Sequence, residues 1–248
     1  MIEFVPQSYR ILAVDDSIIV LDMVKMMLRL ADFQVLTAVS GEGALRLMKK
    51  EGLPHLAIVD INMPFGMDGF EFCEALHEFS DVPVMMLTAV NQTETIIQAI
   101  EEHAEDYMTK PFTAGELVAR VRRVLRSIGG FALKLERLTR ADERLAVNFA
   151  DCKVLINGAP VSLTPTEMKL LYILMRDAGK LVATDFLLRR LWPHELVYQD
   201  RLRVYVHRLR SKIEENPEEP RYIVSRRNKG YLFLPELEES ADGASTGS

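Results

Sequence analysis

Short apolar runs alternate with longer stretches of helical periodicity over the first 126 residues. The apolar runs have the length of β-strands, and three of them are apolar at nearly every position, as in strands covered on both faces. Strands that alternate with helices predict a doubly wound α/β fold, a five-stranded parallel sheet with helices on both faces. The expected strands are residues 10–14, 34–38, 56–59, 84–87 and 106–108, and the helices should begin near Ser17, Gly41, Gly69, Thr93 and Thr113.

This alternation stops near residues 127–130, where the pair Gly129-Gly130 interrupts the chain. We therefore expect a first domain at residues 1–126 and a linker at residues 127–140. A second domain should cover residues 141–235. The acidic, Ser/Gly-rich segment 236–248 is expected to be a disordered tail.

The second domain has a different order of elements, which predicts an α+β fold. Two or three strand-like runs, residues 145–149, 153–156 and 161–163, include Asn157-Gly158, a strong signal for a two-residue hairpin turn. A helix should begin after Thr164, with Glu167 completing a capping box, and should run to about residue 177. Further helices are expected at about 184–191, capped by Thr184, and at about 200–214, followed by a hairpin of residues 222–226 and 231–234.

Composition narrows the class of protein. The two cysteines are about 80 positions apart, offer neither a disulfide framework nor a metal-ligand spacing, and are read as buried thiols in a reducing cytosol. No apolar run approaches the 18 or so residues of a membrane span, and residues 1–10 lack the pattern of a secretory signal. We expect a cytoplasmic protein with no membrane partner.

The formal net charge of −6 hides an uneven distribution. Residues 1–130 contain 11 basic and 19 acidic residues, whereas residues 131–248 contain 19 and 17. Within the second part, residues 189–229 hold 11 basic and only 6 acidic residues. A polyanion is therefore expected to bind there.

Polar residues stand at the carboxyl ends of four of the expected strands, where ligands bind in parallel α/β sheets. These are Asp15-Asp16, Asp60, Thr88 and Lys110-Pro111. Three carboxylates in one crevice repel each other unless a cation lies among them, and oxygen ligands of this kind suit Mg²⁺. We expect Mg²⁺ on Asp16, Asp60 and the backbone carbonyl near Asn62, with Asp15 in support.

These residue types can carry out phosphoryl transfer. A metal-neutralised carboxylate can attack phosphorus and form an aspartyl-phosphate, and Asp60 is the carboxylate best placed to do so. Lys110 would neutralise one phosphoryl oxygen, and the Thr88 hydroxyl would donate a hydrogen bond to another. The catalytic set is thus Asp60, Thr88 and Lys110.

The helix expected at residues 200–214 has two distinct faces. Leu202, Val206, Leu209 and Ile213 fall on one face at helical spacing. The other face is nearly all basic, a composition suited to a major groove lined by phosphates. Its residues are Arg201, Arg203, Tyr205, His207, Arg208, Arg210 and Lys212. The tip of the following hairpin adds Arg226, Arg227 and Lys229, which could reach the minor groove or the backbone of double-stranded DNA.

Residues 9–126 resemble the receiver domains of two-component response regulators, which are flavodoxin-like. The resemblance rests on Asp-Asp, Asp60, Thr-Ala and Lys-Pro-Phe at the ends of different strands. It implies a histidine kinase as phosphoryl donor and makes Thr88 and Tyr107 a switch pair whose ring rotates inward behind the threonine. This chain departs from the family pattern with one extra residue between Pro64 and Gly69 and with His103 in place of a usual glycine.

Residues 145–235 resemble the winged helix-turn-helix effector domains of the OmpR/PhoB subfamily. The matching segments are residues 163–167, Leu191-Trp192, residues 204–213 and Gly230-Tyr231. The resemblance implies that the helix at 200–214 is the recognition helix and that residues 193–199 form the loop that can meet RNA polymerase. Arg203 and the wing sequence depart from the subfamily pattern, which predicts a different target sequence.

The same resemblance implies that phosphorylation promotes a receiver homodimer. Asp106, Glu116 and Arg120 match charged interface positions, and Asp106 could pair with Arg120 across a two-fold axis. Residues 91–105, however, contain no Lys or Arg, and Ile96 stands where a basic partner for Glu116 is expected. A surface ion pair contributes only about 0–1 kcal/mol, so one loss need not abolish the dimer.

The sequence thus predicts a transcriptional regulator that binds DNA under the control of phosphorylation and that is no enzyme beyond its own phosphorylation and dephosphorylation at Asp60. Two alternatives remain open. The receiver could be a protein-interaction module that works without phosphate. The chain could also be a Mg²⁺-dependent phosphohydrolase, which predicts an acid two residues after the nucleophile, where this chain has Asn62.

Overall fold

The first part of the chain folds around a parallel sheet. The computed structural model describes residues 4–89, 104–128, 136–193 and 198–235. A five-stranded sheet, in which every pair of neighbouring strands is parallel, has the order β2-β1-β3-β4-β5. Its strands are β1 (Arg10–Val14), β2 (Gln34–Ala38), β3 (Leu56–Asp60), β4 (Val84–Ala89) and β5 (Asp106–Lys110). The order is that of the flavodoxin-like doubly wound fold, so the predicted fold class is confirmed.

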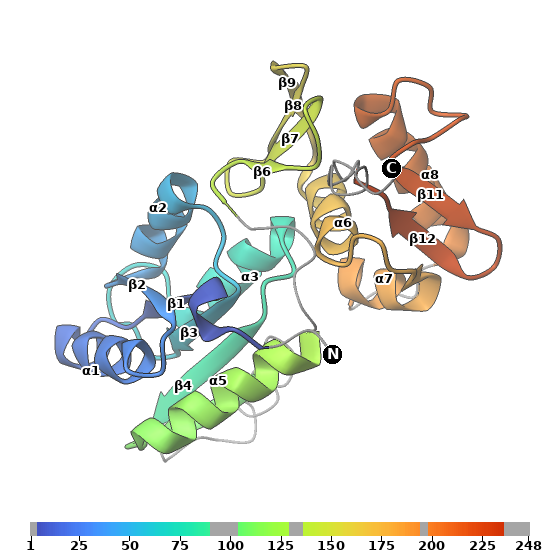
Figure 1. Cartoon of the computed structure of the whole chain (residues 1–248). Coiled ribbons are helices and arrows are strands. Elements are labelled where there is room, and N and C mark those ends of the chain that lie inside the picture. Colours follow the sequence, from blue (N-terminus) through green and yellow to red (C-terminus); the bar gives the residue numbers. More distant parts are fainter. Residues whose placement is uncertain (1–3, 90–103, 129–135, 194–197, 236–248) are drawn as a thin grey trace, which may run out of the picture.

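Helices cover both faces of this sheet (Figure 1). The helical elements are the 3₁₀ turn η1 (Pro6–Ser8) and the α-helices α1 (Ile18–Arg29), α2 (Gly41–Glu51), α3 (Gly69–Phe79) and α5 (Ala114–Ile128). Alternate residues of β1 point to opposite faces, because side chains along a strand alternate. Ile11 and Ala13 enter the core beneath α1 and α5, whereas Leu12 and Val14 enter the core beneath α2 and α3. The helix expected near Thr93 lies outside the described residues.

Three strands extend beyond their predicted ends. β3, β4 and β5 include Asp60, Thr88 and Lys110, which the sequence placed just after the last apolar residue. The ladder continues through these polar positions, because Asp60 lies opposite Leu87 and Thr88 lies opposite Thr109. Backbone hydrogen bonding does not depend on side-chain polarity, so the apolar run ends earlier than the strand.

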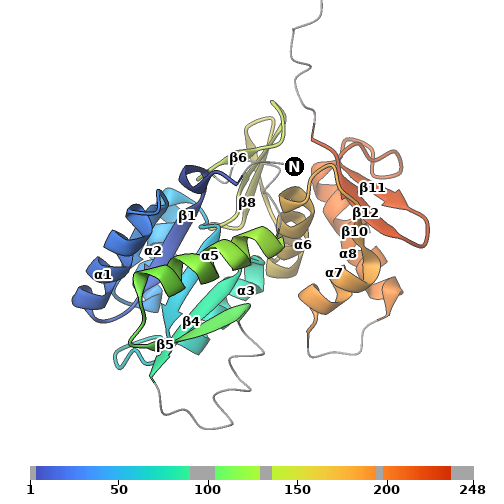
Figure 2. The same ribbon diagram turned by 60° about the horizontal axis from the view of Figure 1, so that its bottom comes forward.

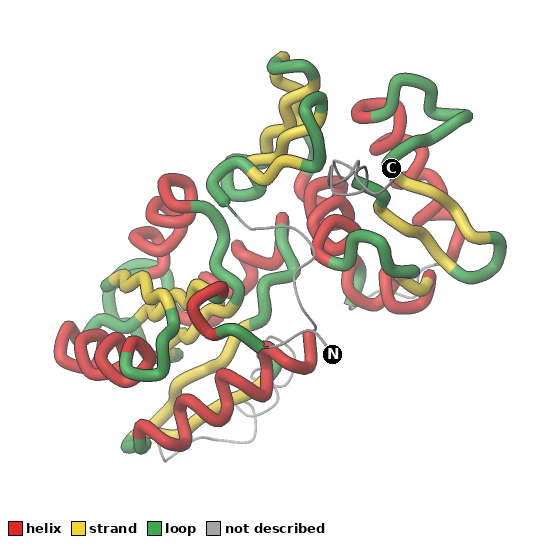
Figure 3. The backbone as a smooth tube through the Cα atoms, in the orientation of Figure 1, coloured by secondary structure: helices red, strands yellow, loops and turns green. Residues whose placement is uncertain are grey.

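The described residues of the second part of the chain form two antiparallel sheets and three helices. Figures 2 and 3 show how these elements are arranged. β6 (Thr139–Arg140), β7 (Leu145–Asn148), β8 (Lys153–Ile156) and β9 (Ala159–Ser162) form a four-stranded sheet in chain order. Next come α6 (Pro165–Arg176), β10 (Val182–Ala183), α7 (Thr184–Leu191) and α8 (Gln199–Ile213). β11 (Ile223–Arg226) and β12 (Gly230–Phe233) form the final hairpin, and β10 pairs with β12 in a three-stranded sheet.

Turn and helix-capping motifs in the sequence predict the local structure correctly at two positions. Asn157 and Gly158 have φ values of 50° and 78°, as the predicted hairpin turn requires. Thr164 and Glu167 form the predicted capping box at the start of α6. Thr184 was expected to cap α7, but Ala183 occupies the cap position and Thr184 is the first residue of the helix. The two-residue strands β6 and β10 were not predicted, since they are too short to show alternation.

Helix α6 is buried on all sides. Every residue from Glu167 to Arg176 is buried, including the charged Lys169 and Arg176. One side of α6 packs against α3 of the receiver, and other sides pack against α7 and α8. Figures 1 and 2 both place α6 between the receiver and α8. As a result, one hydrophobic core continues from β3 and α3 into the second domain.

Some predictions concern residues that are not described. The expected tail, half of the expected linker and part of the loop at residues 193–199 lie outside the described residues. Helix α5 ends at Ile128 and β6 begins at Thr139, so both elements reach into the expected linker. Among the described helices, none is both long enough and apolar enough to cross a membrane.

His55, which precedes β3, makes the stability of the receiver depend on pH. Its Nδ1 accepts a hydrogen bond of 3.0 Å from the backbone N–H of Arg10. Burial, reinforced by the charge of Arg10, lowers the pKa of His55 from 6.5 to about 4. Because the unfolded chain then binds more protons, the free energy of unfolding falls as the pH drops from about 6.5 to 4. The loss approaches about 3 kcal/mol, at about 1.4 kcal/mol per pKa unit.

We therefore expect the denaturant midpoint of His55→Asn to change less between pH 7 and pH 4.5 than that of the wild-type chain. The asparagine side chain can still accept the Arg10 hydrogen bond but does not titrate. His207→Asn, at an exposed position on α8, serves as the matched control and should keep the wild-type pH dependence. Equal pH slopes for His55→Asn and the wild type would contradict this account.

Candidate functional site

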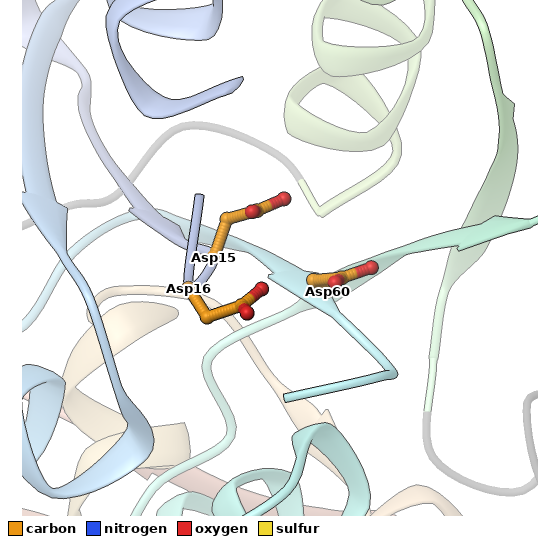
Figure 4. Close-up of side chains that lie close together, drawn as sticks. All are labelled: Asp15, Asp16 and Asp60. Atoms are coloured by element: carbon orange, nitrogen blue, oxygen red, sulfur yellow. The ribbon is translucent and has the colours of Figure 1, made fainter. Parts of the chain in front are cut away.

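A cluster of charged side chains lies at the carboxyl edge of the parallel sheet. Asp15 and Asp16 directly follow β1, Asp60 ends the adjacent β3, and Lys110 ends β5. The structure thus brings together residues that are up to 95 positions apart in the chain. Figure 4 shows the three carboxyl groups grouped at the ends of their strands. Their nearest ligand oxygens all lie within 4.8 Å of one another.

Lys110 links two of these carboxylates. Its Nζ atom lies 2.7 Å from Oδ2 of Asp15 and 2.9 Å from Oδ1 of Asp60. Both acids are nearly inaccessible, with Asp15 1% and Asp60 6% exposed. Oδ1 of Asp15 also accepts a hydrogen bond of 2.9 Å from the backbone N–H of Ser17, at the start of α1. The lysine therefore offsets part of the cost of burying two like charges.

The electrostatics of Asp60 differ from those of an exposed acid. Burial raises the pKa of Asp60 above its usual value, and the charges of Asp15 and Asp16 act in the same direction. The hydrogen bond and the positive charge of Lys110 oppose this shift. Burial alone would lower the pKa of Lys110, but its bonds to Asp15 and Asp60 leave the pKa raised. An added cation near the acids would further favour the charged carboxylates.

The remaining predicted residues of the pocket lie around this cluster. Thr88 is 2% exposed, and its hydroxyl donates a hydrogen bond of 3.3 Å to the carbonyl oxygen of its neighbour Ala89. The ring of Tyr107, on the adjacent strand β5, is 49% exposed. Asn62 stands two residues after Asp60 and is exposed. Of the predicted switch pair, the threonine is thus buried and the tyrosine faces solvent.

The loop after Asp60 is held by a residue of α2. Glu42 accepts a hydrogen bond of 2.9 Å from the backbone N–H of Met67. Hydrogen bonds from the backbone N–H groups of Glu42 itself and of Met67 lower the pKa of Glu42. At the end of the loop, a Cβ atom on Gly69 would overlap the carbonyl oxygen of Asp60, so glycine lets α3 begin directly against the end of β3. Phe65, within the loop, is 84% exposed.

The second predicted site lies on α8 and the β11–β12 hairpin. The four apolar residues of α8 are buried as predicted: Leu202, Val206, Leu209 and Ile213. On the opposite side, Arg203 and His207 line a groove of about 400 Å³ together with Arg226 and Arg227 of the hairpin. Arg201, Arg208 and Lys229 are also exposed. The structure therefore places a basic helix and a basic hairpin on the two sides of one groove.

Not all of the predicted basic residues are available to a partner. The guanidinium of Arg210 donates hydrogen bonds of 3.0 and 2.6 Å to the carbonyl of Ile223 and one of 2.8 Å to the hydroxyl of Ser225. Lys212 donates a hydrogen bond of 2.7 Å to Glu167 of the α6 capping box. These side chains bind α8 to the hairpin and to α6. Helical periodicity alone could not separate them from the exposed residues.

Three further α8 side chains pair with neighbours yet leave the groove side open. Arg203 forms an exposed ion pair of 3.0 Å with Asp200. The guanidinium groups of Arg201 and Arg208 lie over the rings of Trp192 and Tyr205, at 4.7 and 5.5 Å from the ring centroids. Trp192 and Tyr205 also contact each other edge to face. Tyr205 thus supports Arg208 directly and contacts the ring of Trp192, on which Arg201 lies.

The predicted dimer residues pair within one chain in this structure. Arg120 lies 3.1 Å from Oδ1 of Asp106 and 3.0 Å from Oε1 of Glu116. Arg123, which was not singled out from the sequence, lies 2.8 Å from Oδ2 of Asp106. Residues 91–103, which contain no Lys or Arg and where a basic partner was sought, lie outside the described residues.

Sequence reasoning missed a cluster of ion pairs between the two domains. Asp81, between α3 and β4, lies 2.7 Å from Nη1 of Arg176 on α6 and 2.7 Å from Nε of Arg190 on α7. Arg190 also lies 2.9 Å from Glu105, directly before β5. These partners are 85 to 109 residues apart in the chain. No local pattern relates them, so no sequence signal could have found the cluster.

Comparisons with known proteins identify both parts of the chain. Residues 11–122 match the response regulator receiver domain, and residues 158–233 match the C-terminal domain of transcriptional regulatory proteins. The DNA-binding response regulator MtrA of Mycobacterium tuberculosis is 38% identical over 228 residues, which cover 91% of this chain and 97% of MtrA. The transcriptional regulatory protein KdpE of the same species is 35% identical over 224 residues, or 90% and 98% of the two chains.

A solved structure also matches most of the chain. The response regulator DrrB of Thermotoga maritima, an OmpR/PhoB homologue, is 29% identical. The match covers 91% of this chain and 99% of DrrB, with a TM-score of 0.42.

Proposed function

Since this chain belongs to the OmpR/PhoB-type response regulators and regulates transcription through a receiver and a DNA-binding domain, we propose that Asp60 accepts the controlling phosphoryl group. The observation that carries the proposal is the position of Asp60 at the end of a central strand. There it lies 2.9 Å from Lys110 and within 4.8 Å of two further acids. Like its relatives, the chain is a DNA-binding regulator and not an enzyme of metabolism.

Asp60 is a better acceptor than its two neighbours. The carboxylate of Asp15 already binds the Ser17 N–H with one oxygen and Lys110 with the other. Asp16 is exposed and begins the loop into α1. Asp60 has Lys110 as an ion-pair partner on Oδ1, and it lies between Asp15 and the ends of β4 and β5. Thr88 and Lys110 are therefore adjacent to any group that is bound to it.

The oxygen donors of this pocket fit Mg²⁺, a cofactor that the family implies. Asp16 and Asp60 would hold the ion with the backbone carbonyl of Asn62, and Asp15 would support it. The fit rests on the three carboxylate oxygens within 4.8 Å and on the mutual repulsion that a divalent cation would relieve. When bound, Mg²⁺ neutralises charge on the acids and on the phosphoryl oxygens.

The phosphoryl transfer follows from the chemistry of these groups. An Asp60 oxygen forms a bond to phosphorus while the phosphorus–nitrogen bond of a phosphohistidine in the kinase breaks. Lys110 pairs with one phosphoryl oxygen, and the Thr88 hydroxyl turns from the Ala89 carbonyl to donate to another. The exposed ring of Tyr107 then moves inward behind Thr88 as the second member of the switch pair. Hydrolysis of the aspartyl-phosphate by water returns the chain to its starting form.

DNA binding is assigned to the exposed basic residues along the groove between α8 and the hairpin. Arg201, Arg203, His207 and Arg208 would contact the major groove, with Tyr205 supporting them. Arg226, Arg227 and Lys229 would contact the backbone or the minor groove from the hairpin tip. Arg210 and Lys212 position the helix and can contact DNA only at the expense of their internal bonds.

The wider organisation is part of the same proposal. The receiver comprises residues 1–126, the linker 127–140 and the DNA-binding domain 141–235. Phosphorylation promotes a homodimer that uses Asp106, Glu116 and Arg120, which requires the intrachain pairs of Arg120 to rearrange. RNA polymerase would meet the loop at residues 193–199, where the described residue Tyr198 is 82% exposed.

A phosphorylation assay tests the assignment of Asp60. Acetyl phosphate with Mg²⁺ should add one phosphoryl group to the wild-type chain, and chelation of Mg²⁺ should prevent it. Asp60→Asn should remain unmodified, because an amide is not nucleophilic toward phosphorus. Asp32→Asn is the matched control, at an exposed turn with a φ of 68° that asparagine tolerates. Intact-mass measurement reads the result. Modification of Asp60→Asn to the wild-type extent would refute the assignment.

A pair of α8 variants tests the DNA assignment. Arg208→Ala should weaken binding to duplex DNA by roughly 1–3 kcal/mol if the side chain contacts a base. If it contacts phosphate instead, the slope of log affinity against log salt concentration should become less steep by about one. Its thermal stability should be unchanged, since Arg208 is exposed. Lys212→Ala should instead lower stability, because it leaves the buried Glu167 without its lysine. Fluorescence anisotropy at several salt concentrations measures DNA binding, and thermal unfolding measures the stability of each variant. Identical behaviour of both variants would count against the assignment.

A further inference from the structure

The groove between α8 and the β11–β12 hairpin carries positive charge that its own lining does not neutralise. The lining includes four arginines, and there is no Asp or Glu among its described residues. Arg203 pairs with Asp200 beside the groove, and Arg210 donates hydrogen bonds to uncharged acceptors. Arg226 and Arg227 form no ion pair with any residue that the structure describes. The groove therefore has a net positive charge, which favours an anionic partner.

The chain itself contains an acidic stretch soon after this hairpin. Residues 236–248, here called the acidic segment, contain no Lys, Arg or His and four acids, Glu236, Glu238, Glu239 and Asp242. The segment lies outside the described residues. Guanidinium groups bind carboxylates in the same two-point geometry as phosphates. A surface that binds phosphates can therefore also bind this segment.

The acidic segment is attached at the base of the hairpin, where other acids are already present. β12 ends at Phe233, and the backbone N–H of Leu234 donates a hydrogen bond of 2.8 Å to the carbonyl of Tyr222. The loop between α8 and Tyr222 exposes three acids, Glu215, Glu218 and Glu219. Like charges repel each other, so the carboxylates of the segment are disfavoured beside this loop and favoured in the groove.

The groove is within reach of the segment. β12 has four residues and spans about 13 Å at ~3.3 Å per residue. α8 runs alongside the hairpin, and both line the groove (Figure 1). The 13 residues of the segment can span up to roughly 45 Å when extended. Single exposed ion pairs are weak, but covalent attachment gives the segment an effective concentration of roughly millimolar, at which a weak contact is populated.

We propose that the acidic segment occupies the groove between α8 and the hairpin when no DNA is bound, and that it must leave before DNA can bind. The inference rests on the proposed DNA-binding role of the groove and makes the segment an intramolecular competitor of DNA. Because both ligands are polyanions, the competition is electrostatic and weakens as salt rises. It lowers the affinity for every duplex by the same factor, since the segment must be displaced whatever the base sequence.

Zero-length cross-linking with a carbodiimide tests where the segment lies, because the reagent joins a carboxylate to a lysine in contact with it. Two exposed lysines provide the comparison. Lys229 is at the hairpin tip beside the groove. Lys180 is at the hairpin base, next to Gly179, whose N–H donates a hydrogen bond of 2.8 Å to the carbonyl of Phe233. In the full-length chain at low salt, peptide mass mapping should join the segment to Lys229, and a duplex of mixed sequence should suppress that product. Cross-links to Lys180 without any to Lys229, or a Lys229 product that DNA leaves unchanged, would overturn the proposal.

Affinity for the same duplex, measured by fluorescence anisotropy, is the second readout. Deletion of residues 236–248 should tighten binding roughly threefold or more at low salt, because a tethered competitor at about millimolar concentration is removed. The slope of log affinity against log salt concentration should also become steeper. Glu238→Gln combined with Glu239→Gln should give part of this gain. Asp22→Asn combined with Asp32→Asn removes the same charge from exposed receiver positions and is the matched control, with no expected gain.

Equal affinity with and without residues 236–248, or equal gains from the two double variants, would refute the competition. This failure is distinguishable from failure of the proposed function. If both chains bind the duplex, and Arg208→Ala weakens both, equal affinities refute only the role of the segment. If neither chain binds the duplex at low salt, the DNA-binding role of the groove is wrong, and the role of the segment fails with it.

Discussion

Lys110 makes it possible for two carboxylates to be buried side by side at the edge of a parallel sheet. Its ammonium group lies within 2.9 Å of both Asp15 and Asp60, on strands that do not adjoin its own. This contact requires β1, β3 and β5 to end at the same edge of the sheet. The parallel pairing of β1 with β3, of β3 with β4 and of β4 with β5 aligns their ends in this way. A site balanced in this way responds strongly to one added cation or one added phosphoryl group, because buried charges are poorly screened.

The same principle operates a second time between the domains. Asp81 is a buried acid whose charge is balanced by arginines from another part of the chain. The two charge clusters lie at opposite ends of strands β4 and β5, with the carboxylate pocket at the carboxyl ends and the interdomain ion pairs at the amino ends. Strands β4 and β5 therefore connect the two charge clusters directly.

The sequence predicted those features that depend on local chemistry or on regular periodicity. The parallel α/β sheet, the acidic pocket and the buried face of α8 follow from alternation, from polar residues at strand ends and from helical spacing. Prediction from the sequence failed where the interacting residues are far apart in the chain. The internal roles of Arg210 and Lys212 depend on what approaches α8 after folding, and the pairing of Asp81 depends on how two domains dock. Residue spacing along one helix contains neither kind of information.

The central claim is that the charge on Asp60 controls DNA binding. Its most direct test is the affinity of the full-length chain for duplex DNA, measured at constant salt with and without beryllofluoride, a phosphoryl mimic. The wild-type chain should bind more tightly with the mimic, and Asp60→Asn should show no change. An equal gain in affinity for both proteins, or no gain for the wild-type chain, would contradict the account.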